Sequence, residues 1–502
     1  MLETVKEAKI GSIVPLLREI DHEIDALDYF SKASNCGKSR HSLLFQHGNY
    51  SFGTASPCIM VSGKGMNFEI KALNETGKRI LALIKKDFGF CDKVVYNRDR
   101  IHGALSSTKK TVSEDQRLAS RSHMDIISVL ANRFSLKGAG MPSCGLLGMF
   151  SPGFISGVPD ETGYLAYFAD NMFLVDHAAR KSYFIAGAVI TDHKREKTHA
   201  DCIKTLNNFE KLLQKKAPKL LKAKKKKFEV QHASGKEELL ASIKDIRRSI
   251  AESELLFANA SSVASCNFYG NPLELYASYR RLNPGNTYYI SHDEGINISS
   301  FSGTGIIVNA GEREISLSMS TSRPLRKSNA IDADTQNKKE AALKSDEGEI
   351  IRHVILADCA RNEMARVCKT GTRHLESLFS TDSYGGILLK AKGMLREGLN
   401  ELCAAASMMN FWNGITKQRA FELSTQARRQ SLGFHSGAIV MAYPGSSIEV
   451  SSINSLALRK DKITVAASSA VFHSSNDEHE AEKNSAEMEL LLSNIKEAGG
   501  MK

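Results

Sequence analysis

Acidic side chains gather near the start of one predicted helix. Apolar residues in the range 346–368 recur at spacings of three and four, which predicts an amphipathic helix. Glu347, Glu349 and Asp358 lie on it and are candidates for a magnesium site, because Mg²⁺ prefers oxygen ligands. The alternative is an ordinary helix start, where the positive end of the helix dipole favours acids. His353 on the same helix is predicted to be a packed side chain rather than a base.

Several common reaction motifs are missing from the sequence. It contains no glycine-rich phosphate loop, no H-E-x-x-H metal pair and no G-x-S-x-G nucleophile turn. The nine cysteines are dispersed and form no C-x-x-C pair. This pattern argues against a disulfide framework or a zinc site and favours reduced thiols in the cytoplasm.

The composition is that of an ordinary globular chain with one unusual charged run. Of 502 residues, 42% are hydrophobic and 25% are charged, so a large core can form. Nine of the eleven net positive charges come from lysines in residues 211–227. This run could bind a polyanion, but no aromatic residue interleaves with it, so a solvated linker is preferred and nucleic acid is not expected as a partner. No apolar run is long enough to cross a membrane. The first 25 residues contain acids throughout and no continuous apolar segment, which argues against a secretory signal.

These chemical groups must be positioned by a mixture of helices and strands. The expected helices are Glu75–Lys86, Lys236–Phe257, 346–368, 396–409, 417–429 and 478–497. The expected strands are Tyr164–Asp176, Tyr183–Ile190, Tyr288–Ile290, Gly305–Asn309, Ala438–Ala442 and Lys462–Ala467. Because this order is not a βαβ repeat, we predict an α+β fold with large antiparallel sheets. The expected division is an N-terminal region 1–200, a lysine-rich connector 201–232 and a C-terminal domain 233–502.

The range 346–372 resembles the most recognisable stretch of the chorismate-utilising enzymes. From Arg352 it reads R-H-V-I-L-A-D-C-A-R-N-E-M-A-R-V-C-K-T-G-T, where that family has E-H-x-M-L-V-D-L-A-R-N-D-x-x-R-[IV]-C-x-P-G-[ST]. Looser matches occur in the family's order at 271–284, Ser322–Pro324, Asp382–Tyr384 and Gly414–Ala420.

The N-terminal half resembles one branch of that family, anthranilate synthase component I. Ser42–Leu44 lies where that subunit has L-L-E-S, and Gly145–Gly153 is similar to its G-G-x-F-S-Y segment. The resemblance implies two large antiparallel sheets packed near-orthogonally with helices outside. It also implies magnesium-dependent conversion of chorismate and ammonia to anthranilate and pyruvate, the first step of tryptophan biosynthesis, with ammonia supplied by a glutamine amidotransferase partner.

The residues at the implied metal site depart from the family pattern. The earlier acid of the first pair survives as Glu349, but Arg352 stands where a magnesium-ligating glutamate precedes the histidine. The second glutamate, in the C-terminal E-x-x-E-T-x-x-K motif, falls on Ala481, or on Glu482 if the match slips by one residue. Because an arginine repels Mg²⁺, we expect magnesium binding to be impaired.

The residues implied in catalysis are also replaced. The family's acid–base histidine falls on Ile387, its carboxylate-binding arginine on Asn454, and the lysine of the C-terminal motif on Ser485. An aliphatic side chain has no titratable proton, and a neutral amide is no bidentate cation. The G-A-G turn that holds a carboxylate becomes Ser468–Ala470. The substrate-binding residues that the resemblance retains are Arg323, Tyr384, Lys417 and Arg419.

The family's tryptophan-binding segments are altered too. L-L-E-S ends here in Phe45-Gln46 or Gln46-His47, and N-P-x-P-Y becomes N-P-G-N-T-Y at 283–288. The ammonium group of tryptophan would lose its carboxylate partner. We therefore predict weak or absent tryptophan inhibition.

Three functional hypotheses follow. The first is an anthranilate synthase component I-like protein whose chemistry is strongly impaired or lost. The second is an enzyme with altered chemistry, in which Arg352 and Lys390 hold an anionic ligand, unless Lys390 points to solvent. The third is a binding protein, which partners an amidotransferase or binds a polyanion through 211–227.

Overall fold

In the part of the chain that the structure describes, 23 strands form the fold, with helices around them. The computed structural model describes residues 2–499 apart from 106–119, 137–141, 158–161, 217–226, 233–234, 284, 321–332, 382–386, 410–413, 416 and 427–430. The helices are α1 Leu2–Glu7, α2 Ala26–Ala33, α3 Glu75–Ile84, α5 His123–Arg133, α6 Pro152–Ser156, α7 Arg195–Gln214, α8 Lys236–Ala251, α9 Pro272–Leu282, α10 Ala333–Ser345, α11 Glu347–Val367, α12 Glu401–Met408, α13 Lys417–Gln426 and α14 Asp477–Ala498.

The strands run through the whole chain. They are β1 Ser12–Ile20, β2 Leu43–His47, β3 Tyr50–Thr54, β4 Ile59–Lys64, β5 Asn67–Ala72, β6 Lys93–Tyr96, β7 Arg100–Ala104, β8 Ser135–Leu136, β9 Gly145–Phe150, β10 Tyr164–Ala169, β11 Asn171–Asp176, β12 Lys181–Val189, β13 Val230–His232, β14 Phe257–Asn267, β15 Thr287–His292, β16 Gly295–Asn309, β17 Glu314–Ser320, β18 His374–Thr381, β19 Ile387–Met394, β20 Gly414–Ile415, β21 Ala438–Tyr443, β22 Ser447–Arg459 and β23 Lys462–Val471.

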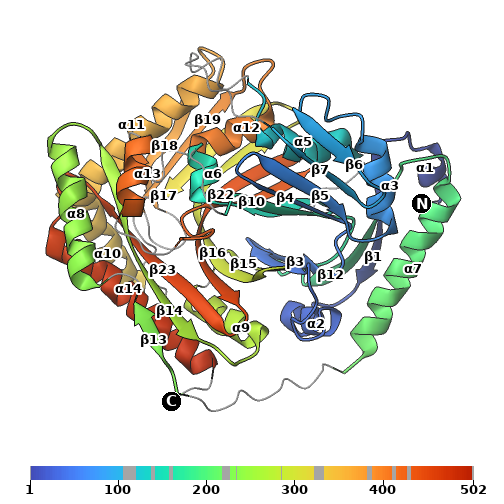
Figure 1. The fold of residues 1–502 in the computed structure, drawn as a ribbon, viewed down its shortest axis with the longest axis horizontal. Coiled ribbons are helices and arrows are strands. Elements are labelled where there is room, and N and C mark those ends of the chain that lie inside the picture. The colour runs from blue at the N-terminus through green and yellow to red at the C-terminus, as the bar shows by residue number, and fades with distance from the viewer. Residues whose placement is uncertain are drawn as a thin grey trace.

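The predicted α+β class with large antiparallel sheets is confirmed. Among the described strands, pairing is antiparallel everywhere except between β1 and β8. Hydrogen bonds join all 23 described strands into one network. The long strands β16 and β22 connect its parts, since each of them pairs with strands on both of its sides. Figure 1 shows β14 and β23 on one side of the molecule and β4, β5 and β12 on the other, with α8 and α14 outside the first group and α7 outside the second.

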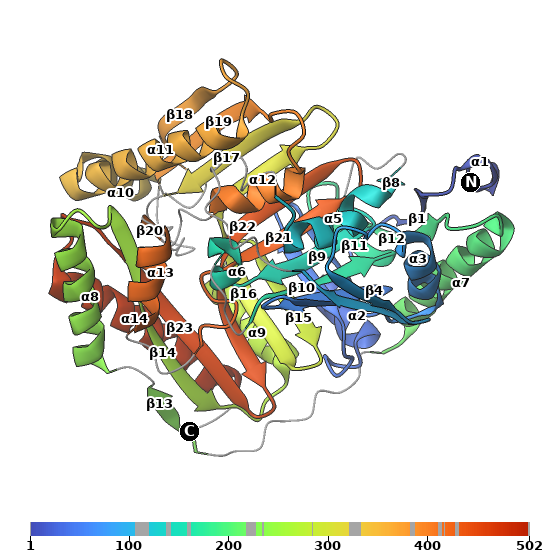
Figure 2. The ribbon, with the colours of Figure 1, turned by 45° about the horizontal axis from the view of Figure 1, so that its top comes forward.

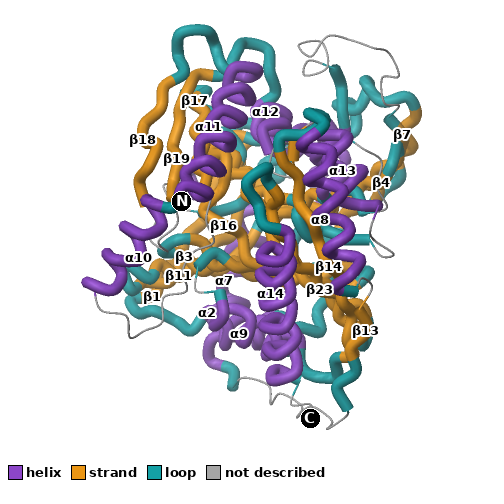
Figure 3. Tube along the Cα trace, turned by 90° about the vertical axis from the view of Figure 1, so that its left-hand side faces the viewer, coloured by secondary structure: helices purple, strands orange, loops and turns teal. Residues whose placement is uncertain are grey.

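Helices cover the outer faces of the strands. Figure 3 shows α8 and α14 in front of β14 and β23, with α9 beside α14, and apolar contacts from α8 and α14 reach both strands. Figure 2 shows α11 lying against β19, with β17 and β18 beside it. This arrangement brings the start of α11 toward the start of α14, although the two helices are far apart in sequence.

Two expected elements differ from the prediction. The strand expected over Tyr164–Asp176 is two strands that meet at Asp170, whose carbonyl accepts a hydrogen bond from the amide of Gly187 at 2.6 Å. β10 then pairs with β4 and β9, while β11 pairs with β3 and β12. The helix expected over Lys236–Phe257 ends at Ala251, because Ser253 adopts a positive φ of 61° before β14 begins.

Strands from the two ends of the chain pair directly with each other. β2 pairs with β15, and β9 pairs with β21. The expected division at 1–200, 201–232 and 233–502 stays a prediction. Part of the expected connector is α7, which packs on β12 through Cys202, Leu206 and Phe209. Its most lysine-rich part, 217–226, lies outside the described residues.

Two expectations from composition concern cysteines and membranes. All nine cysteines lie in the described part of the chain, and none forms a disulfide. Within the same residues, no helix combines the length and the apolar character that crossing a membrane requires.

Candidate functional site

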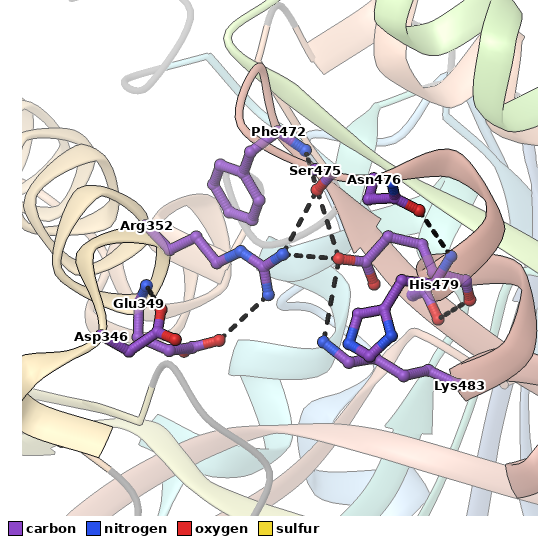
Figure 4. A network of polar contacts seen from close by, with 10 residues as sticks. Asp346, Glu349, Arg352, Phe472, Ser475, Asn476, His479 and Lys483 are labelled. Atoms are coloured by element: carbon purple, nitrogen blue, oxygen red, sulfur yellow. Dashed lines mark hydrogen bonds and ion pairs between the residues drawn. The ribbon is translucent and has the colours of Figure 1, made fainter. Parts of the chain in front are cut away.

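The implied metal site lies where α11 and α14 begin. The Asp346 side chain caps α11 by accepting a hydrogen bond from the amide of Glu349 at 2.8 Å. The Asn476 side chain caps α14 by accepting one from the amide of His479 at 2.9 Å. These caps place Glu349 and Glu480 in the first turns, where the helix dipoles favour carboxylates. Figure 4 shows both helix starts and the side chains between them.

The guanidinium group of Arg352 lies between the two carboxylates. Its Nη1 lies 3.1 Å from Glu349 Oε1, and its Nη2 lies 2.5 Å from Glu480 Oε1. Nη2 also donates to Ser475 Oγ at 3.3 Å, and the Phe472 ring lies 5.6 Å from the guanidinium carbon. The Arg352 and Glu349 side chains are 16% exposed and the Glu480 side chain 3%. The three charges therefore form a largely buried ion triad.

The residues present do not fit a magnesium ion. Two carboxylates face each other, as a metal site requires, but an arginine occupies the space between them. Within the described residues, no group of three His, Cys, Asp or Glu side chains could hold a metal ion. Burial raises the pKa of Glu349, and the charge of Arg352 opposes that rise. The cation that Glu349 contacts is thus the Arg352 side chain and not a metal ion.

The structure separates the other acids considered for this site. Glu347 and Asp358 are exposed, and Asp358 pairs with Arg361 at 2.6 Å on the outer face of α11. His353 is fully buried and hydrogen-bonds the carbonyl of Leu378, as the packed interpretation predicted. Of the three candidate acids, Glu349 is the one that belongs to the triad.

Sequence matching missed Glu480, the second carboxylate of the triad. Ala481 is fully buried in an apolar cluster with Leu239, Ile243 and Val471, while Glu482 is exposed. The signal for Glu480 was its spacing from Asn484 and Met488, since residues four apart share one face of a helix. That face packs against the sheet.

The replaced catalytic positions offer little chemistry. Ile387 is fully buried at the start of β19, and Ser485 is half-buried on α14. Asn454 is exposed on β22, on the opposite strand face from Ser455. Its backbone carbonyl accepts a hydrogen bond from Ser299 Oγ at 2.6 Å. None of these three side chains provides the titratable or cationic group that the resemblance implies.

The retained substrate-binding residues are only partly described. Arg419 lies on α13 and pairs with Glu254 at 3.0 Å, so its charge is engaged at the surface between α13 and the end of α8. Lys417 is the first residue of α13. Arg323 and Tyr384 lie outside the described residues. Of this predicted set, the structure therefore describes two residues, Lys417 and Arg419, both on α13.

A cluster of hydroxyl groups replaces the implied glycine turn. Ser468 Oγ lies 2.6 Å from Ser261 Oγ, 3.0 Å from His435 Nε2 and 3.3 Å from Ser436 Oγ. The neighbouring Ser469 Oγ donates to the carbonyl of Glu480 at 3.4 Å, which links the cluster to α14. These residues come from three separate segments, so no spacing in the sequence indicated that they would meet.

A cavity of about 610 Å³ adjoins the hydroxyl cluster. Val263 and Ala466 line it, each two residues along its strand from Ser261 and Ser468 and on the same face. Residues of β4, β5, β22 and β23 also line it. Its volume is in the usual range for a small-molecule site.

The segments expected to bind tryptophan do come together. β2 pairs with β15, so that Phe45 faces Tyr288. The Phe45 ring stacks on Phe52 at 5.3 Å and on Tyr288 at 6.0 Å, so the three rings lie side by side on one face of the paired strands. His47 Nε2 lies 3.0 Å from Glu449 Oε2. Burial lowers the pKa of His47, but its hydrogen bond to Glu449 and that residue's charge outweigh burial and raise it overall.

Tryptophan is expected not to bind this chain. Glu449, the carboxylate beside these paired strands, is already paired with His47. The rings of Phe45, Phe52 and Tyr288 pack against one another on the same strands. An isothermal titration with tryptophan should give no saturable heat, while a tryptophan-inhibited anthranilate synthase titrated alongside should give it. Tight binding to this chain would contradict the prediction.

Comparisons with known proteins agree with the geometry. Residues 156–492, more than half of the chain, match the chorismate binding enzyme family. Anthranilate synthase component 1 of Buchnera aphidicola subsp. Rhopalosiphum maidis is 25% identical over 462 residues, covering 88% of each chain. The Escherichia coli K12 protein of the same name is 23% identical over 399 residues, covering 76% of each.

Solved structures show the same fold. Anthranilate synthase component I from Streptococcus pneumoniae TIGR4 superposes with a TM-score of 0.64 at 16% identity, covering 90% of this chain and 92% of that one. The menaquinone-specific isochorismate synthase MenF from Escherichia coli gives a TM-score of 0.57 at 12% identity, covering 98% of each. The family match and the shared architecture establish that this chain belongs to the chorismate binding enzymes and has the fold of anthranilate synthase component I.

Proposed function

We propose that this chain is an anthranilate synthase component I-type protein that has lost magnesium-dependent conversion of chorismate to anthranilate. The observation that carries the proposal is the Arg352 guanidinium between Glu349 and Glu480. In the implied reaction, a divalent cation at such a carboxylate pair holds a carboxylate of the substrate. Here both Nη atoms of Arg352 are engaged by the protein's own carboxylates, so no free charge remains for that task.

The residues around the triad support the same proposal. Ile387 cannot give or accept a proton, and Asn454 is a neutral side chain on the strand face away from the cavity. The altered-ligand alternative has less support, because Lys390 is exposed on β19 and Arg352 is already paired.

A binding role remains compatible with this architecture. The cavity next to Ser468 is large enough for a small anionic ring compound. The relatives' name describes one component of a synthase, so we propose a glutamine amidotransferase subunit as partner and a cytoplasmic location. The polyanion hypothesis rests on 211–227, of which 217–226 lie outside the described residues, and it stays a prediction.

Anthranilate formation is expected to be at least about 100-fold slower than for an authentic synthase, because acid–base and electrostatic groups each contribute such factors. The assay follows anthranilate fluorescence with purified protein, chorismate, Mg²⁺ and high ammonium. Ammonium removes any need for the amidotransferase subunit. Sustained Mg²⁺-dependent product from this chain, with the authentic synthase as positive control, would overturn the proposal.

A further inference from the structure

We propose that Arg352 is a built-in replacement for a divalent cation. Its guanidinium joins the first turns of α11 and α14 through Glu349 and Glu480, so the two helix starts are held together without metal. This inference deepens the proposed function and rests on it. It adds that the carboxylate pair is intact and that one side chain prevents it from binding Mg²⁺ or Mn²⁺.

The charges around the triad are already balanced. Glu349 and Glu480 carry two negative charges, and Arg352 lies between them. Lys483 approaches Glu480 at 3.9 Å from the next turn of α14, with its side chain 44% exposed. A dication would meet two cations beside two carboxylates, and like charges in a poorly hydrated place repel strongly. The wild-type chain should therefore not bind a divalent ion here.

The guanidinium is fixed from several sides. Ser475 Oγ accepts a hydrogen bond from Arg352 Nη2 and another from the amide of Phe472 at 3.0 Å, and it donates to Glu480 Oε1 at 3.3 Å. The Phe472 ring covers the guanidinium, as Figure 4 shows. Arg352 thus takes part in a defined network and is no loosely placed surface cation.

One carboxylate oxygen is left over in this network. Within the described residues, Glu349 Oε2 is buried and has no hydrogen-bond partner. A buried oxygen of this kind is costly unless a donor or a cation meets it. A divalent ion bound between Glu349 and Glu480 could use this oxygen once Arg352 no longer fills the space.

Exchanging the arginine for an acid is therefore expected to create a divalent-cation site. Arg352→Glu removes the guanidinium and leaves three carboxylates at the two helix starts. Arg361→Glu is the matched control, because Arg361 lies on the same helix, makes the same i,i+3 pair with an acid, Asp358, and is 69% exposed. Both variants change the net charge equally.

The experiment is a titration of the full-length proteins with Mn²⁺, in which electron paramagnetic resonance measures the free ion. Arg352→Glu should bind one Mn²⁺ with a Kd below about 1 mM, the range of weak carboxylate sites, and Mg²⁺ should compete. The wild type and Arg361→Glu should bind Mn²⁺ at least about tenfold more weakly, because both lack the third carboxylate and retain the Arg352 guanidinium.

Two results would overturn the inference. One is wild-type binding equal to that of Arg352→Glu. The other is a folded Arg352→Glu, with a cooperative thermal transition, that binds no better than Arg361→Glu. If Arg352→Glu does not fold, Arg352→Gln against Arg361→Gln applies the same test, because glutamine removes the guanidinium and its charge without adding a carboxylate.

The two proposals fail in different ways. Anthranilate production by the wild type without metal, at the rate of an authentic synthase, would contradict the expected slow conversion but leave the role of Arg352 untouched. Absence of Mn²⁺ binding in the folded variants would refute the role of Arg352 while the loss of catalysis stands.

Discussion

Arg352→Met is expected to lower the free energy of unfolding by about 3 to 5 kcal/mol at pH 7, the usual effect of removing one member of a buried charge network. The side chain packs between Glu349 and Glu480, which would remain buried without a cation. Methionine keeps much of the apolar contact with Phe472, so the loss reports mainly on charge. Denaturant unfolding followed by circular dichroism measures it.

The loss should shrink as the pH falls. Burial already raises the pKa of Glu349, and removing Arg352 takes away the larger of the two charges that oppose that rise, the other being Lys483. A group whose folded-state pKa is raised stabilises the fold at low pH and loses that contribution as the pH increases. The variant should therefore approach the wild type near pH 4. Arg361→Met removes an exposed pair and should cost less than about 1 kcal/mol, so equal losses in the two variants would contradict the buried triad.

Wild-type stability is expected to fall between about pH 4 and pH 6 because of Asp170. This residue, at the junction of β10 and β11, is 8% exposed, and burial raises its pKa to about 6. In that pH range the folded chain keeps the proton that the unfolded chain has released, so unfolding becomes easier as the pH rises. A difference of about two pKa units corresponds to about 3 kcal/mol, and the contribution is constant above pH 6.

Asp170→Asn should remove this pH dependence. The amide resembles the protonated acid and its oxygen can still accept from Asn171 Nδ2, which lies 2.9 Å from the carboxylate in the wild type. At pH 7 the variant should be more stable than the wild type by up to about 3 kcal/mol. Asp201→Asn is the control, since Asp201 is exposed and lines the same small cavity as Asp170. Parallel pH profiles for wild type and Asp170→Asn would rule the interpretation out.

Elements with strong periodicity and end signals could be predicted from the sequence. The helix expected over 346–368 is found at Glu347–Val367, because Asp346 caps it and its apolar spacing continues to the last turn. The break at Asp170 had no such signal. β10 and β11 are buried on both faces, so their residues read as one apolar run and give no indication of a bend.

The candidate site was predictable only in part. Glu349 and Arg352 lie three apart on one helix, so their contact follows from helical spacing. Glu480 reaches them from α14, whereas the motif match placed the family's glutamate on the next residue, Ala481, whose side chain packs in an apolar cluster. Ser261, Ser468 and His435 meet only because β14 and β23 pair, which no local pattern reveals.

The pairing of β2 with β15 and of β9 with β21 also limits which changes such a chain can accumulate during evolution. A shortened product that starts at residue 233 would leave the edges of β15 and β21 uncovered. Open strand edges invite association with other chains. A single substitution, such as one that places an arginine at position 352, leaves these edges covered. This architecture therefore accommodates the loss of catalytic side chains far better than the loss of either half of the chain.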